Sequence, residues 1–82
     1  IDILLFNYQF NCFVVVELKV TELRKEHIGQ IEIYMNYIDK NIKRIDMSNT
    51  IGLIISKYKN EYIIEYSSDG RIKVTTYLIN RN

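Results

Sequence analysis

An acidic and a basic side chain stand two positions apart at the end of an apolar run. The run Val14–Val16 is followed by Glu17, Leu18 and Lys19. Because side chains at i and i+2 of a strand point to the same face, Glu17 and Lys19 would be presented together, with Leu18 on the opposite face. The valines have no polar counterpart on either face, which predicts a central strand covered on both sides.

A second carboxylate, Asp2, reaches the same place if the first residues form a hairpin. A turn centred between Gln9 and Phe10 pairs residues whose numbers sum to nineteen, which sets Asp2 opposite Glu17. Directly opposed residues have Cβ atoms about 4.5–5.5 Å apart, and facing carboxylates repel unless a cation lies between them. Oxygen ligands of this kind suit a hard ion such as Mg²⁺ or Mn²⁺. Lys19 beside them could stabilise the charge that develops on a phosphate during hydrolysis.

A helix is predicted after this strand, from about Lys25 to Lys43, because apolar residues follow one stripe at helical spacing. The stripe consists of Ile28, Ile31, Met35, Ile38 and Ile42. A neighbouring, half-polar row would border the open end of the sheet, and it consists of His27, Gln30, Tyr34, Tyr37 and Asn41. Gln30 and Tyr34 are i,i+4 neighbours, and one of them could contact a phosphate or a metal-bound water. An ordinary amphipathic boundary row explains the same pattern, and His27 alone is interpreted as a solvated surface group.

The remaining elements predict an α/β fold with a mixed sheet. Thr50–Ser56 is a second continuous apolar strand, so strand, helix and strand form a right-handed parallel crossover. Gly52 within it would allow close approach of the helix or a ligand. We expect a short helix at Glu61–Tyr66, a turn at Ser67–Gly70 and a final strand at Ile72–Leu78.

Composition limits the classes of protein. Eighty-two residues form one domain, and 48% hydrophobic with 26% charged residues is typical of a globular chain. The single cysteine, Cys12, cannot form an internal disulfide, which favours a buried thiol in a reducing cytoplasm. No apolar stretch approaches the length of a membrane span. A net charge of +1 neither supports nor excludes nucleic acid as a partner.

The spacing of the candidate residues resembles the PD-(D/E)XK nuclease superfamily. Asp2 is followed after fourteen residues by Glu17-Leu18-Lys19, and then by a helix with Gln30-x-x-x-Tyr34. The local sequences, which run from Ile1 to about Leu78, are similar to one branch, the C-terminal nuclease domain of bacterial YhcG-like proteins. They are Ile-Asp-Ile-Leu-Leu-Phe, Val-Val-Val-Glu-Leu-Lys-Val, Gly-Gln-Ile-Glu-Ile-Tyr and Thr-Ile-Gly-Leu-Ile-Ile-Ser-Lys.

This resemblance implies a restriction-endonuclease-like mixed sheet with a long crossover helix. Asp2 and Glu17 would be the metal-binding acids, Lys19 the catalytic lysine, and Gln30 with Tyr34 the helix motif beside the site. The superfamily core resembles an αβββαβ unit, so residues 1–82 would be a single partial nuclease-like domain whose first helix and strand are missing.

The favoured function is therefore metal-dependent hydrolysis of phosphodiester bonds in nucleic acid, with DNA as the expected substrate and Mg²⁺ or Mn²⁺ as the cofactor, within a larger protein. Two alternatives stay open: a catalytically inactive module that binds nucleic acid or protein, and a structural oligomerisation domain. Because the strand at Ile1–Phe6 would lack a neighbour on one side, we also expect a homo-oligomer.

Overall fold

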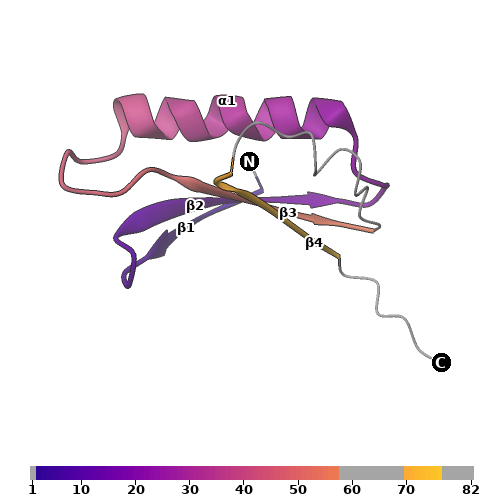
Figure 1. The fold of residues 1–82 in the computed structure, drawn as a ribbon, viewed down its shortest axis with the longest axis horizontal. Helices are drawn as coiled ribbons and strands as arrows, with labels where there is room; N and C mark the ends of the chain where they lie inside the picture. Colours follow the sequence, from indigo (N-terminus) through magenta and orange to yellow (C-terminus); the bar gives the residue numbers. More distant parts are fainter. Residues whose placement is uncertain (1, 58–69, 77–82) are drawn as a thin grey trace.

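The computed structural model describes residues 2–57 and 70–76 of the 82-residue chain. Its elements are β1 (Ile3–Asn7), β2 (Cys12–Lys19), α1 (Lys25–Asn41), β3 (Ile51–Ser56) and β4 (Ile72–Thr76). The strands form one four-stranded sheet in the order β1-β2-β3-β4, in which β1 is antiparallel to β2, and β2, β3 and β4 are parallel (Figure 1). The predicted mixed α/β fold with a crossover helix is confirmed. The helix predicted at Glu61–Tyr66, most of the turn before Gly70 and the end of the last strand lie outside the described residues.

The β1–β2 hairpin has the predicted register. Leu4 pairs with Val15 and Phe6 with Phe13, so paired numbers sum to nineteen. The turn is stabilised by Asn7, whose side-chain oxygen accepts hydrogen bonds from two backbone amides that follow it, at 3.0 and 3.2 Å. The left-handed φ of 51° falls at Asn11, a residue type that tolerates this conformation.

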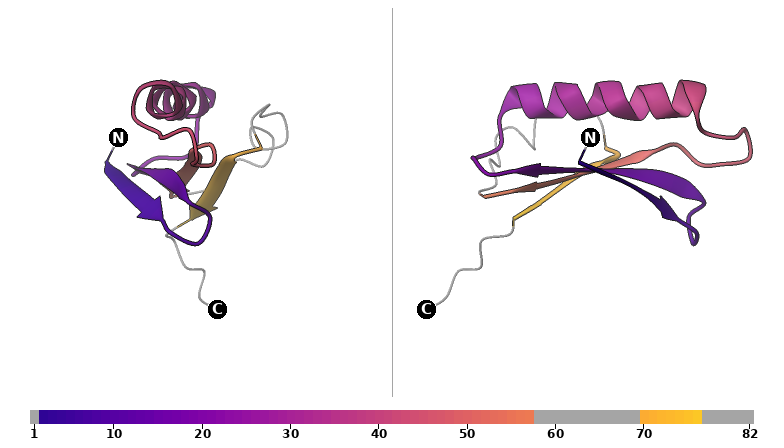
Figure 2. Two further views of the ribbon diagram at one scale, coloured as in Figure 1. Left: turned by 90° about the vertical axis from the view of Figure 1, so that its left-hand side faces the viewer. Right: turned by 180° about the vertical axis from the view of Figure 1, so that it is seen from behind.

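Helix α1 covers one face of the sheet (Figures 1 and 2). Its buried side chains are Ile28, Ile31, Met35 and Ile38, which pack in one cluster with Val15 and Ile54 of the sheet. Gly52 makes this contact close, because a Cβ atom there would lie 2.7 Å from Met35 Sδ. The helix begins where the sequence predicts and ends two residues before the predicted Lys43. Within residues 2–57 and 70–76, no helix has both the length and the apolar character needed to cross a membrane.

The face of β2 opposite the helix is only partly covered. Val15, on the helix side, is fully buried, and on the other face Cys12 and Val16 are also buried while Val14 is half-buried. In the part of the chain that the structure describes, the single helix covers one face, so the prediction of cover on both sides holds for Val16 and only in part for Val14. Apolar side chains therefore stand on the uncovered face, Ile3, Leu5 and Leu18 among them, each about half exposed.

A polar network joins three elements at the end of the sheet where β2 and β3 begin. Asp39 of α1 accepts hydrogen bonds from the Thr50 backbone amide at 2.9 Å and the Thr50 hydroxyl at 2.7 Å. Its second carboxylate oxygen lies 2.9 Å from Nη1 of Arg71, next to β4. The network fixes the end of the helix to the starts of two strands.

Candidate active site

The acid–base pair of β2 lies on the helix side of the sheet, at the end where β2 and β3 terminate. Glu17 and Lys19 follow Val15 at intervals of two, so all three share the face that α1 covers. Glu17 is buried, with a side chain 7% exposed, and Lys19 is partly buried at 23%. Lys19 Nζ lies 3.9 Å from Glu17 Oε2. The strand thus holds a carboxylate and an ammonium close together in partly excluded solvent, where charges interact more strongly than in bulk water.

Asp2 stands next to Glu17 at the start of the hairpin. The ladder ends at the pair of Ile3 with Val16, and beyond it the backbone amide of Asp2 donates to the Val16 carbonyl at 3.2 Å. The Asp2 side chain then accepts a hydrogen bond from the Leu18 amide, with 2.6 Å between Oδ2 and the nitrogen. This bond fixes one carboxylate oxygen against β2 and leaves Oδ1 for another partner.

Gln30 and Tyr34 lie one turn apart on α1, as predicted, and differ in their surroundings. The Gln30 side chain is exposed, while the half-buried Tyr34 packs against the core. Within the described ranges, no hydrogen bond joins the two side chains. Both residues therefore lie on the half-polar row of α1, but no hydrogen bond between them fixes either side chain.

His27 is the residue whose surroundings the sequence reasoning missed. It is half-buried, and its Nδ1 accepts a hydrogen bond from the Arg24 amide at 3.0 Å, so the prediction of a solvated surface group is wrong. Burial lowers the pKa of His27, and the Lys19 ammonium lowers it further. The signal was present in the predicted helix start at Lys25, since His27 then occupies the third helical position, from which side chains reach back to the residue before the helix.

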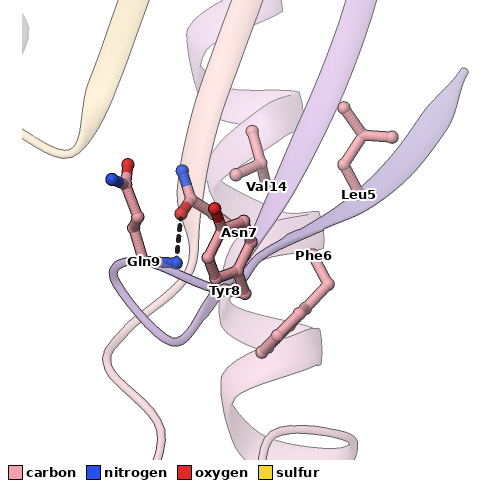
Figure 3. A pocket seen from close by; sticks show the side chains of 6 residues that line it. All are labelled: Leu5, Phe6, Asn7, Tyr8, Gln9 and Val14. Atoms are coloured by element: carbon pink, nitrogen blue, oxygen red, sulfur yellow. Dashed lines mark hydrogen bonds between the residues drawn. The ribbon is translucent and has the colours of Figure 1, made fainter.

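A shallow hollow lies at the other end of the hairpin, beside the turn (Figure 3). It is lined by Leu5, Phe6, Asn7, Tyr8, Gln9 and Val14. None of these side chains carries a charge, so the hollow offers nothing that would hold a cation or neutralise a phosphate. The charged residues Asp2, Glu17 and Lys19 are at the opposite end of the hairpin.

The donors at the Asp2–Glu17 end fit a hard divalent cation. Two carboxylates stand at this end, that of Glu17 buried, and across residues 2–57 and 70–76 no group of three or more histidine, cysteine or acidic side chains could hold a metal ion. Zn²⁺ usually requires three or four protein ligands, whereas Mg²⁺ keeps several waters and binds through one or two carboxylates with substrate phosphate. The donor set matches the second pattern.

Comparison with known proteins agrees with this geometry. Residues 1–81 match the family described as the YhcG PDDEXK nuclease domain. The chain belongs to this family. A curated protein of Escherichia coli (strain K12) named "Putative nuclease YhcG" is 29% identical over 70 residues, which are 85% of this chain and 19% of that protein. No solved structure gives a significant match.

The mixed sheet and the crossover helix are consistent with membership of the YhcG nuclease-domain family. The chain spans about a fifth of the length of its curated relative.

Proposed function

We propose that this domain hydrolyses phosphodiester bonds of DNA with Mg²⁺, or with Mn²⁺ in its place, as part of a larger protein. The observation that supports the proposal is the position of Glu17 and Lys19 at the end of β2, with Lys19 Nζ 3.9 Å from the Glu17 carboxylate, beside Asp2, whose carboxylate accepts the Leu18 amide. Family membership supports the reaction class. A setting in the reducing cytoplasm fits a single, buried cysteine, Cys12.

Each residue has a distinct part in the proposed reaction. Asp2, through Oδ1, and Glu17 hold the metal, which when bound neutralises charge on the phosphate and lowers the pKa of a bound water. Lys19 places an ammonium beside the phosphate, where negative charge grows in the transition state. Gln30 and Tyr34 border the site from the helix and orient the substrate or its waters.

The decisive test is cleavage by the full-length protein of labelled DNA and RNA, with Mg²⁺, Mn²⁺ or a chelator. We expect cleavage of DNA that the chelator abolishes, no cleavage by Glu17→Ala, and a strong loss with Lys19→Ala. Gln30→Ala should lose less, because its contribution is positional. Cleavage that persists in Glu17→Ala would refute the metal site.

Lys73→Ala is the matched control for Lys19→Ala. Lys73 is an exposed lysine of β4 that pairs with Leu53, whose position alternates with the helix-facing Gly52 and Ile54. The Lys73→Ala substitution therefore removes the same charge from the same sheet, but on the face opposite Lys19. A site at Lys19 requires the Lys73 variant to cleave at the wild-type rate.

We also propose that β1 pairs with another strand, from a second copy of the protein. The observation that favours this association is the position of β1 at the sheet edge, where Ile3 to Phe6 are each 41–51% exposed. An apolar strand edge readily recruits a further chain.

A further inference from the structure

His27 lies near the start of α1, and the acid–base pair lies near the end of β2. Helix α1 begins above the end of the sheet where β2 terminates (Figure 1). His27 is the third residue of this helix, and Gln30 and Tyr34 follow it at spacings of three and four, along one row. The imidazole is thus the member of this row nearest the helix start.

A hydrogen bond fixes the tautomer of the ring. Nδ1 of His27 accepts the Arg24 backbone N–H at 3.0 Å, which requires an unprotonated Nδ1. In the neutral ring the proton is then on Nε2, so this nitrogen is a donor. A ring protonated at both nitrogens could not accept the Arg24 hydrogen bond.

Two of the four charged groups that influence the ring belong to the site. Burial is the main cause that lowers the pKa of His27, followed by the Lys19 ammonium; Glu26 raises the pKa, Arg24 lowers it and Glu17 raises it. Together with the Arg24 hydrogen bond, these surroundings favour a neutral ring with one N–H.

We propose that His27 is a substrate-binding residue of the nuclease site, which donates a hydrogen bond from Nε2 to a non-bridging oxygen of the phosphodiester. The proposal rests on the function proposed above and adds a residue to it. Lys19 supplies charge without a fixed direction, whereas the imidazole N–H supplies a directed donor. A neutral donor also adds no positive charge beside the ammonium and the divalent cation.

A simpler role for His27 is to cap the helix, and two substitutions separate the roles. In Asn the side-chain oxygen is two bonds from Cβ, as Nδ1 is in histidine, so His27→Asn keeps an acceptor for the Arg24 amide and has no atom at the Nε2 position. In Gln the amide nitrogen is three bonds from Cβ, as Nε2 is, so His27→Gln restores a donor there. Both side chains are compatible with a helix start.

The experiment measures kcat/KM for DNA cleavage and the melting temperature of full-length wild type and both variants. We expect His27→Asn to melt near the wild-type temperature and to lose about tenfold in kcat/KM, as for a lost hydrogen bond to a charged group. His27→Gln should recover part of that loss. A folded His27→Asn protein with wild-type kcat/KM, or equal losses in both variants, would overturn the proposal.

Two further measurements keep the result interpretable. Glu17→Gln in the same assay separates the two proposals, because wild-type cleavage by that variant refutes the nuclease site itself, whereas failure of the His27 expectation alone refutes only this inference. If His27→Asn does not fold, the imidazole ¹⁵N resonances of the wild-type protein test the proposal instead. Adding a phosphorothioate DNA oligonucleotide should shift the Nε2 signal that is missing in His27→Gln, and an unchanged signal would contradict the proposal.

Discussion

The carboxylate of Asp2 has two separable tasks at the end of the hairpin. Oδ2 accepts the Leu18 amide at 2.6 Å, and in the proposed site Oδ1 faces the metal. Asp2→Asn keeps an oxygen for the amide and removes the charge. We expect this variant to need at least about tenfold more Mg²⁺ for half-maximal cleavage, since weaker perturbations of metal sites already cost 10–100-fold in affinity.

Asp2→Ala is the companion variant, because it removes the acceptor as well as the charge. It should show the same metal requirement or a higher one, together with a lower melting temperature than Asp2→Asn. Magnesium titrations of cleavage and thermal melts of both proteins check this separation. An unchanged magnesium requirement in both variants would exclude Asp2 as a ligand.

At the scale of elements, the contact between α1 and β3 depends on the missing side chain of Gly52. Its Cβ would lie 2.7 Å from Met35 Sδ and 3.0 Å from Ile31 Cδ1, so Gly52→Ala must displace both side chains. We expect a loss of about 1–3 kcal/mol in the free energy of unfolding. Denaturant titration measures it.

Gly29 provides the opposite case within the same helix. An added Cβ there meets nothing within 4 Å, and alanine is the better helix former. Gly29→Ala should therefore raise the free energy of unfolding by about 0.5–1 kcal/mol. If both glycine variants shift stability in the same direction, the close packing at Gly52 is not what distinguishes them.

The network around Asp39 predicts how stability depends on pH. Burial raises the pKa of Asp39, but hydrogen bonds from the Thr50 hydroxyl and amide and from Arg71, with the Arg71 charge, outweigh burial and hold the pKa below its ordinary value of 3.8. The unfolded chain therefore takes up this proton first. The stabilisation is complete above about pH 4 and is lost as the pH falls through the lowered pKa.

Asp39→Asn should remove that pH-dependent part, so its free energy of unfolding falls less steeply than that of the wild type below about pH 4. Asp39→Ala leaves the buried Thr50 amide without its acceptor and should cost about 1–3 kcal/mol at neutral pH. Asp46→Asn is the control, since this acid is exposed and its carboxylate pairs with the neighbouring Arg44 at 3.2 Å. Urea titrations at several pH values test all three proteins, and a wild-type acid slope in Asp39→Asn would contradict the assignment.

The sequence predicts those parts of the fold whose residues follow a local, periodic pattern. The turn between Gln9 and Phe10 set the hairpin register, and the apolar stripe from Ile28 set the helix and its buried face. The Asp39 network was not predictable, because its partners are 11 and 32 positions away and long-range polar contacts leave no period in the sequence. His27 was overlooked because a lone histidine on a helix carries no information until its capping position is recognised.

For the whole molecule, the exposed edge is expected to govern association. Within the described residues β1 has a strand neighbour on one side, and Leu5 is 51% exposed on the face away from α1. Leu5→Lys would place a charge on this edge without emptying the core, and should shift the protein toward the monomer. Sedimentation velocity of a protein limited to residues 1–82, over a range of concentrations, measures the shift.

Ile33→Lys is the control for that experiment, since Ile33 is 68% exposed on α1, away from the edge. It should leave the association unchanged. A wild-type protein that stays monomeric at the highest concentration would refute pairing through β1.

The hairpin register also has a consequence for the order in which the molecule forms. Asp2, Glu17 and Lys19 lie in or next to one hairpin. Gln30, Tyr34 and His27 belong to α1, the helix of the crossover between β2 and β3. Hairpins close in about 1–10 μs, and contacts that are distant in the sequence form more slowly. The ionic half of the proposed site is therefore assembled by a local step of folding, before the crossover brings α1 onto the sheet. Repulsion between its two carboxylates opposes that step and a divalent cation relieves it, so metal would act on the nascent hairpin before there is a nuclease to activate.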